Sequence, residues 1–200
     1  MGGLAGETHG TSVRRTIYTR PMNQPASPES LHPRLHLGTS SWSSRDWDGV
    51  FYPKGTAPGD YLAFYATRFH TVEVDATFYR IPSVTMTKKW AAELPAGFRL
   101  AAKVPQVIMH EKCMLGCAED LDAFVQAMAL LGEKLGPLLL QFAYQKKASP
   151  ITEREFHARL ERFLPTLPPG PRFAIEIRNK TWLRVLGQLI VAEELEPPYG

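Results

Sequence analysis

Five short β-type segments alternate with helical segments along this chain, and no hairpin signal joins any two of them. The β-type segments cover 35–42, 71–80, 99–105, 138–142 and 172–178. Helical spacing of apolar residues lies between them, over 60–69, 83–94, 119–136 and 152–163. Strands separated by helices build parallel sheets from βαβ units, so this order predicts an α/β fold.

Two of the helical segments carry their own start signals. Ser83 precedes the second segment as an N-cap, and Thr152 with Glu155 forms a capping box at the start of the last. The 17 prolines in 200 residues favour many short elements with firm ends, which fits such an alternation.

Each predicted strand has one aliphatic face and one face with polar groups near its C-terminal end. Val72 and Val74 alternate with Glu73 and Asp75 in the second segment. The later segments place the following residues on the corresponding polar face: Lys103, Gln141, Glu176 and Arg178. Parallel strands are usually apolar on both faces. A closed βα-barrel gathers these second faces in its interior, and βα-barrel sites form at the C-terminal strand ends, so we predict a TIM-like (β/α) barrel.

The polar strand-end residues are the candidates for chemistry. Glu73, Glu176 and Lys103 are the catalytic candidates. Together with Arg178 they place four charged groups at strand ends on one face, which is hard to explain by packing alone. The structural alternative is a set of buried ion pairs that fixes the register. Glu73 and Glu176 also suggest a glycosidase-type carboxyl pair. A metal site of Glu73, Asp75 and Glu176 is a further alternative, which lacks an inward histidine.

A second metal alternative lies in the loop after the third strand, where His110, Cys113 and Cys117 form H-x2-C-x3-C. Zinc sites usually have four ligands in tighter paired spacing, so we predict no metal here.

Aromatic residues crowd the loop after the first strand. Trp47, Phe51 and Tyr52 follow Trp42 closely, and they indicate a small satellite core beneath a long loop. The alternative is that Trp42 and its neighbours wall a pocket, since aromatic rings suit sugar or heterocycle faces.

Several function classes are excluded by composition and by missing motifs. The net charge of +3 is too even for a nucleic-acid surface. No apolar run of about 18 residues is present, so we predict no membrane span. Two cysteines make no disulfide framework, and a cytoplasmic location is expected. No dinucleotide, P-loop, α/β-hydrolase or zincin motif occurs, and the sequence identifies no cofactor.

Residues 1–34 are rich in Gly, Ser, Thr and Pro and show no period. We interpret them as a disordered N-terminal extension and 35–200 as the folded domain. A transit peptide is the alternative for this Arg-bearing stretch, although Glu7 and the missing amphipathic period speak against it.

The chain also carries a series of longer motifs in order: LGTSSWSSRDWDGVFYP, YLAFYATRFHTVEVDATFYRIPS, GFRLAAKVPQVIMH, LLLQF and FAIEIRNKTWL. Over 35–183 this series resembles the YecE-like family, domain of unknown function 72. The resemblance implies an eight-stranded TIM-like barrel and supplies no reaction. The family's characteristic polar residues correspond to Glu73, Lys103, His110, Gln141, Glu176 and Arg178.

Three features depart from that family's pattern. Asp75 stands where the family usually has Asn, and Asn179 where it has His. Family members also continue for several strands beyond the fifth, so this chain resembles about five of eight units of an incomplete barrel. We expect it to be a fragment, a truncated product, or a half that closes with a partner, and to be poorly stable or self-associating through open barrel edges when isolated.

The leading functional hypothesis is a strand-end pocket that hydrolyses a small polar or sugar-like substrate. The proposed substrate contacts are Asp75, His110, Gln141, Arg178 and Trp42. The alternative is a non-catalytic module that binds a small ligand, so the sequence leaves open whether the protein is an enzyme. A nucleic-acid role for the basic lead is disfavoured, because three arginines are too few.

Overall fold

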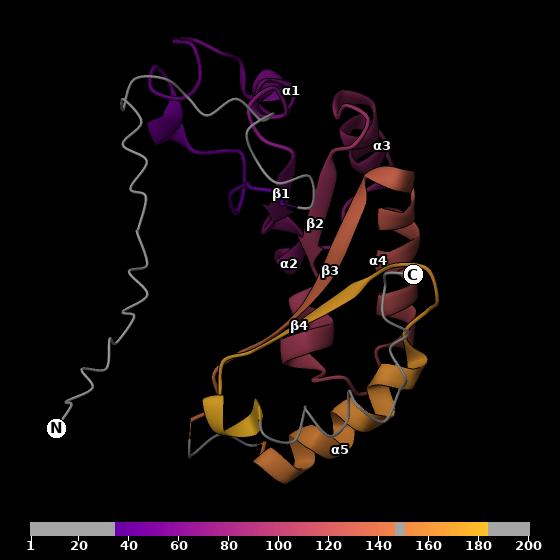
Figure 1. Cartoon of the computed structure of the whole chain (residues 1–200). Coiled ribbons are helices and arrows are strands. Elements are labelled where there is room, and N and C mark those ends of the chain that lie inside the picture. The colour runs from indigo at the N-terminus through magenta and orange to yellow at the C-terminus, as the bar shows by residue number, and fades with distance from the viewer. Residues whose placement is uncertain (1–34, 147–150, 184–200) are drawn as a thin grey trace, which may run out of the picture. The chain divides into compact units, whose positions relative to one another are not determined.

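The computed structural model describes residues 35–146 and 151–183, and in this part of the chain four strands form one parallel sheet. They are β1 (Thr71–Val74), β2 (Arg99–Lys103), β3 (Leu135–Phe142) and β4 (Phe173–Ile177), and they lie side by side in chain order (Figure 1). Every neighbouring pair is parallel. The predicted extension, 1–34, lies outside the described residues, as does 184–200.

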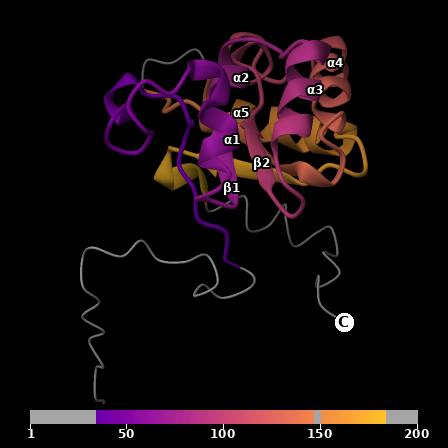
Figure 2. The same cartoon turned by 90° about the horizontal axis from the view of Figure 1, so that it is seen from above.

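Five α-helices accompany the strands: α1 (Tyr61–Tyr65), α2 (Ala76–Tyr79), α3 (Val84–Glu93), α4 (Ala118–Ala129) and α5 (Glu153–Phe163). The longer ones, α3, α4 and α5, pack on one face of the sheet, and Figure 2 shows α3 and α4 together on one side of the strands. Between sheet and helices lies one core, in which Leu100, Leu140, Phe124 and Leu160 are fully buried. None of the described helices is long and apolar enough to cross a membrane.

Both predicted helix starts are confirmed. The Ser83 hydroxyl accepts a hydrogen bond from the Met86 N–H at 3.2 Å, which satisfies one free donor of the first turn of α3. Thr152 and Glu155 form the complete capping box at the start of α5. This cap orients an amphipathic helix that buries Phe156, along with its other apolar residues, against the sheet.

The first predicted strand, 35–42, is wrong as a strand: it forms only one parallel bridge, opposite Glu73. The hydroxyl of fully buried Tyr65 occupies the place of the next rung. It accepts the Thr39 N–H at 2.8 Å and donates to the Thr71 carbonyl at 3.1 Å. A side chain therefore joins the two backbone groups that a continued ladder would pair directly.

The second predicted strand, 71–80, is also shorter than expected, because α2 begins directly after it. Thr77, in α2, turns its hydroxyl back onto the strand ends, with the carbonyls of Val74 at 2.9 Å and Lys103 at 2.8 Å. The chain thereby leaves the sheet at Asp75.

The aromatic loop forms the predicted satellite core. Tyr52 stacks on Tyr61 with ring centroids 4.1 Å apart, and Phe51 meets Trp47 and Phe64 edge to face. These rings pack against each other and against α1, beside the main core. The loop is therefore held by its own apolar contacts.

The second face of the sheet carries none of these long helices in the described part of the chain. Its residues, such as Glu73, Ala101 and Leu139, are half-buried where their neighbours on the helix-covered face are fully buried. A hollow of about 330 Å³ lies on this face between the segment around Gly38 and strands β1 and β2. We call this second face, defined by Glu73, Ala101, Lys103, Leu139, Gln141 and Glu176, the open face.

Candidate functional site

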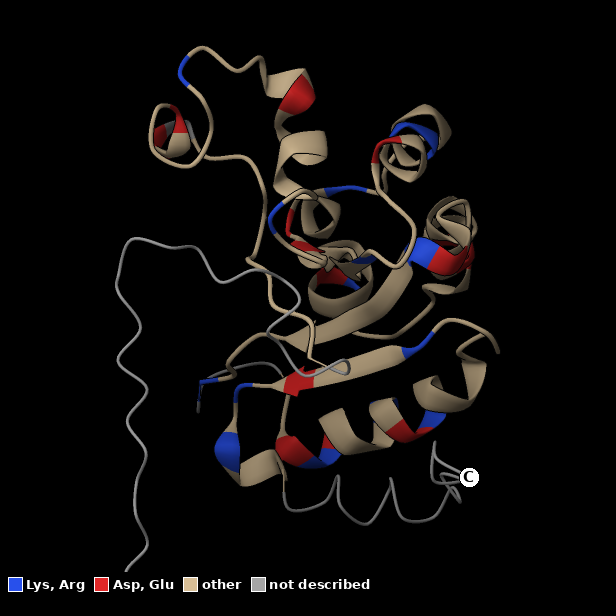
Figure 3. Ribbon diagram, turned by 45° about the horizontal axis from the view of Figure 1, so that its top comes forward, with Lys and Arg blue, Asp and Glu red and all other residues tan. Residues whose placement is uncertain are grey.

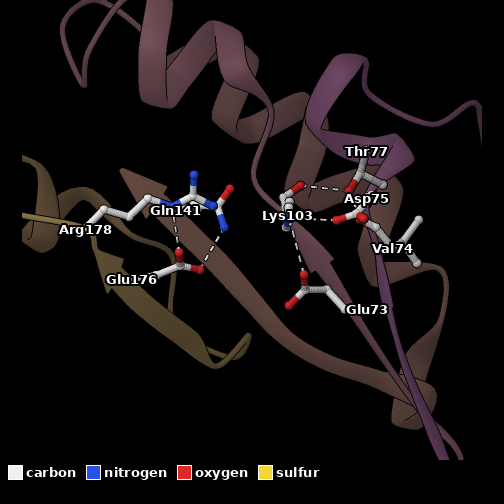
Figure 4. A network of polar contacts seen from close by, with 8 residues as sticks. All are labelled: Glu73, Val74, Asp75, Thr77, Lys103, Gln141, Glu176 and Arg178. Carbon is white, nitrogen blue, oxygen red and sulfur yellow. Dashed lines mark hydrogen bonds and ion pairs between the residues drawn. The ribbon is translucent and has the colours of Figure 1, made fainter. Parts of the chain in front are cut away.

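Lys103 is the centre of the first group of charges on the open face. Its ammonium nitrogen lies 2.7 Å from Asp75 Oδ1 and 3.4 Å from Glu73 Oε1 (Figure 4). The strand register explains this, because Glu73 pairs with Ala101. Asp75, two residues after Glu73 and just beyond β1, therefore lies beside Lys103, two residues after Ala101. One cation thus holds two carboxylates at the C-terminal ends of β1 and β2.

Thr77 fastens this group, although the sequence analysis missed it. Its buried hydroxyl contacts the Val74 and Lys103 carbonyls and so ties the end of β1 to the end of β2. The backbone that carries Lys103 is fixed as a result. No period or motif marks a threonine two residues beyond the charged position, so the signal appears only in three dimensions.

Glu176 is the centre of the second group. It pairs in register with Gln141, whose side-chain amide donates to Glu176 Oε2 at 2.7 Å. Arg178 Nε donates to Oε1 of the same carboxylate at 2.9 Å. Arg178 lies two residues after Glu176 and therefore on the same face of the strand. Both oxygens of Glu176 accept a hydrogen bond in this arrangement (Figure 4).

His110 joins the second group through the backbone of β3. It belongs to a π-helical turn, Val107–Glu111, that follows β2. Its Nε2 lies 3.1 Å from the Gln141 carbonyl, and the Phe78 ring meets its imidazole edge to face at 4.9 Å. Single π-helical turns are rare and frequently lie at functional sites.

Asn179 fastens the ends of β3 and β4, which the sequence analysis also missed. Its side-chain oxygen accepts the Gln145 N–H at 2.8 Å, and its amide donates to the Gln145 carbonyl at 2.9 Å. From the sequence, Asn179 counted only as the loss of a titratable group. In the structure Asn179 is buried, and its two hydrogen bonds hold the loop after β3 beside the end of β4.

The electrostatics hold Lys103 and Glu176 in their charged forms. Burial alone would lower the pKa of Lys103, but the hydrogen bond and charge of Asp75, with those of Glu73, outweigh it and raise the pKa. For Glu176, the hydrogen bond from Gln141 lowers the pKa against the opposing effect of burial, and Arg178 lowers it further. The two groups therefore present a fixed cation and a fixed carboxylate.

Neither metal alternative gains support. In residues 35–146 and 151–183, no three His, Cys, Asp or Glu side chains gather as a metal-ion site. The Lys103 ammonium lies against the carboxylates that the first alternative needs. In the second, Cys113 and Cys117 are buried in the core, whereas His110 contacts the Gln141 carbonyl.

Trp42 is the one proposed contact residue that the structure places elsewhere. Its ring meets the buried Trp90 of α3 edge to face at 5.7 Å, and its carbonyl accepts a hydrogen bond from the Tyr52 hydroxyl. It thus packs toward the helix-covered side. The other proposed residues meet in the two groups around Lys103 and Glu176.

Charge along α5, on the helix-covered side, follows a different pattern. Residues of both signs follow one another along α5, as Figure 3 shows, so this helix presents a mixed solvent surface. The paired charges on the open face are different, since they meet from separate strands.

Comparisons with known proteins agree on a family. A family model described as "Protein of unknown function DUF72" matches residues 36–195. The UPF0759 protein YunF of Bacillus subtilis (strain 168) is 27% identical over 156 residues, which are 74% of this chain and 52% of that relative. This chain therefore spans about half of the length of that relative.

Solved structures show the same likeness. A DUF72 family protein from Enterococcus faecalis V583 superposes with a TM-score of 0.57 at 27% identity, covering 78% of this chain and 55% of that one. A DUF72 family protein from Thermotoga maritima MSB8 gives a TM-score of 0.52 at 24% identity over 76% of this chain and 62% of that one, and it supports the fold alone. The predicted fold class, an α/β fold of the TIM-barrel type, is confirmed.

Proposed function

The chain belongs to the DUF72 family, a family of unknown function, and we propose that its open face binds and hydrolyses a small polar or sugar-like substrate. The observation that carries the proposal is the presence of two charge groups on one face, at the C-terminal ends of four parallel strands. In barrels of this type, substrates bind at that end.

The groups on the open face suit a substrate rich in hydroxyl groups. Glu73 and Asp75 are carboxylates about a third exposed, so each has oxygen atoms that can accept hydrogen bonds from a ligand. The Lys103 ammonium, only 16% exposed, can stabilise negative charge that develops on the substrate. These three residues would orient the substrate beside Glu176.

Glu176 has a defined role in this proposal. Its lowered pKa keeps the Glu176 side chain ionised. In a glycosidase-type pair with Glu73, Glu176 could serve only as that ionised member, because the acid of such a pair must carry a proton. We assign it to electrostatic stabilisation and orientation of the substrate.

A non-catalytic binding module is the second candidate, and one observation favours it. Lys103 and Glu176 are both held charged by their partners, so neither readily gives up or takes a proton near neutral pH. A binding protein needs no such group, whereas a hydrolase does.

A set of p-nitrophenyl glycosides and short-chain esters separates the two. We expect the wild-type chain to release p-nitrophenol from at least one member. Glu73→Gln and Glu176→Gln should each lower kcat by about 10²-fold or more while binding, followed by ligand-observed NMR, persists. Glu161→Gln, on the exposed side of α5, is the matched control. Binding without turnover would favour the module. A chain that shows neither binding nor turnover would refute the site.

The free edges of the sheet lead to a proposal about partners. β4 pairs only with β3 in the described sheet, and the segment opposite β1 contributes a single bridge. Unpaired strand edges favour association with another chain. We propose self-association through these edges, which analytical ultracentrifugation would detect as a concentration-dependent mass. A monomer over the whole concentration range would refute it.

We also propose a cytoplasmic location. Cys113 and Cys117 are both unpaired and buried, which suits a reducing compartment. Cell fractionation with an antibody against the chain tests this, and recovery from a secreted or membrane fraction would contradict it.

A further inference from the structure

We propose that His110 is the proton-transfer residue of the open face, with its Nδ1 as the atom that takes a proton from an attacking water. The inference rests on the proposed hydrolytic function and names the group that this function lacks. The substrate it implies is a neutral ester or glycoside, in which water displaces a leaving group from an electrophilic carbon.

The tautomer of His110 follows from its one hydrogen bond. Nε2 lies 3.1 Å from the Gln141 carbonyl oxygen. A carbonyl oxygen can only accept, so the hydrogen of this bond belongs to Nε2. In the neutral imidazole the lone pair is then on Nδ1. The backbone of β3 thus selects which nitrogen can act as a base, as the orienting group of a catalytic triad does.

The Nε2 contact leaves Nδ1 as the second ring nitrogen of a partly exposed side chain. Among residues 35–146 and 151–183, the recorded contacts of His110 are the hydrogen bond to Gln141 and the ring contact with Phe78. His110 is partly exposed, so its second ring nitrogen is the one left to meet water or a substrate. An imidazole with one nitrogen fixed and the other open is the arrangement that a general base needs.

Strand β3 and helices α4 and α2 pack against His110 or its turn, and Glu111 and Lys112 follow it in the chain. The π-helical turn contacts β3, which presents the neutral Gln141, and α4, where Asp120 is taken up by Lys112 at 2.5 Å. α2 presents Phe78, followed by Tyr79. Of the charges of the site, Glu176 accepts a hydrogen bond from the Gln141 side chain, and Lys103 is the last residue of β2.

The other charged groups at the strand ends have partners: Glu73 and Asp75 contact Lys103, and Glu176 contacts Gln141 and Arg178. Lys103 and Glu176 are held in their charged forms, as described above. Histidine is the side chain that ordinarily changes charge between about pH 5 and 8. Among the described residues of the site, His110 is the one imidazole, beside the charged Lys103 and Glu176.

In the proposed step, the water oxygen bonds to the electrophilic carbon, and one water proton passes to Nδ1. The bond from that carbon to the leaving group breaks, and the leaving group keeps the electron pair. The imidazolium, stabilised by the Gln141 carbonyl at Nε2–H, then returns the proton to the leaving group. The products are an acid or a free sugar and an alcohol.

His110→Gln is the decisive variant, because its amide can still donate to the Gln141 carbonyl but it has no basic nitrogen. On the p-nitrophenyl set we expect it to keep the binding and thermal stability of the wild type, to lower kcat by about 10²–10⁴-fold, and to lose the acidic limb of the pH–rate profile. His70→Gln, on an exposed histidine, is the control. A second measurement, ¹H–¹⁵N long-range NMR of the imidazoles, should show His110 with its proton on Nε2.

The outcomes separate this inference from the proposed function. Turnover that Glu176→Gln abolishes but His110→Gln retains, with an unchanged pH profile, overturns the role of His110 alone. A neutral His110 imidazole that carries its proton on Nδ1 also overturns the role of His110. A wild-type chain that turns over no member of the set overturns the hydrolytic proposal and His110 with it.

Discussion

The two faces of the sheet are built from the same strands but follow different physical rules. On the helix-covered face, Leu100, Leu138 and Leu140 are fully buried in one core. On the open face, Lys103 and Glu176 keep partial exposure and are satisfied by partners from other strands. The comparison teaches that the first face specifies the fold, whereas the second is free to carry chemistry.

The magnitudes support this division. Burying one Leu-sized side chain stabilises a protein by roughly 1.5–3 kcal/mol. Ion pairs that stay partly exposed contribute about 0–1 kcal/mol each. A few leucines therefore outweigh the whole set of charges on the open face, and the charges need another reason to be there.

Adjacent leucines of β3 give the strongest test of the comparison. Leu140 is fully buried, while Leu139 points to the open face and is half-buried. We expect Leu140→Ala to lower the free energy of unfolding by about 2–5 kcal/mol, because it leaves a cavity in the core. Leu139→Ala should cost about 1 kcal/mol. Urea denaturation measures both, and equal losses would contradict the assignment of the faces.

The Tyr65 hydroxyl is expected to have the next largest effect. Tyr65→Phe leaves the Thr39 N–H and the Thr71 carbonyl without the group that joins them. We expect a loss of about 1–3 kcal/mol in the free energy of unfolding. Tyr61→Phe is the matched control, since the Tyr61 hydroxyl has no recorded hydrogen bond within residues 35–146 and 151–183. A smaller loss for Tyr65→Phe than for its control would show that the hydroxyl does not hold the first segment.

Glu176 gives the smallest effect, and it depends on pH. Its folded-state pKa is lower than the ordinary 4.5, so its contribution to stability is present above about pH 4.5 and is lost as the pH falls through the lowered value. Glu176→Gln removes that dependence. The stability difference between wild type and variant should therefore shrink below pH 4.5, as measured by thermal unfolding from pH 7 to pH 2. A difference that grows on acidification would mean that the pKa is raised.

Much of this fold follows from periodicity. The period of two along the strands predicted which residues face the helices, and Ser83 and Thr152 predicted two helix starts. The same period placed Lys103 and Glu176 on one face, because strand side chains alternate strictly. The local pattern was sufficient for these predictions, because the residues that show the alternation are the same residues that pack in the core.

The fastening contacts could not be predicted. Tyr65, Thr77 and Asn179 each bond to backbone atoms of a different element. Their partners are set by how the strands are laid side by side, and no sequence spacing records that. The first strand was wrong for this reason, because a side chain took the place of its ladder.

The central claim is that the open-face charges serve a ligand and not the fold. One combined variant tests it most directly: Glu73→Gln, Asp75→Asn, Lys103→Met, Glu176→Gln and Arg178→Met. Neutral groups of similar size in place of ion pairs are often neutral or stabilising, so we expect its free energy of unfolding in urea to lie within about 1 kcal/mol of the wild type. A loss of about 3 kcal/mol or more would show that these charges hold the sheet together, and would contradict the account.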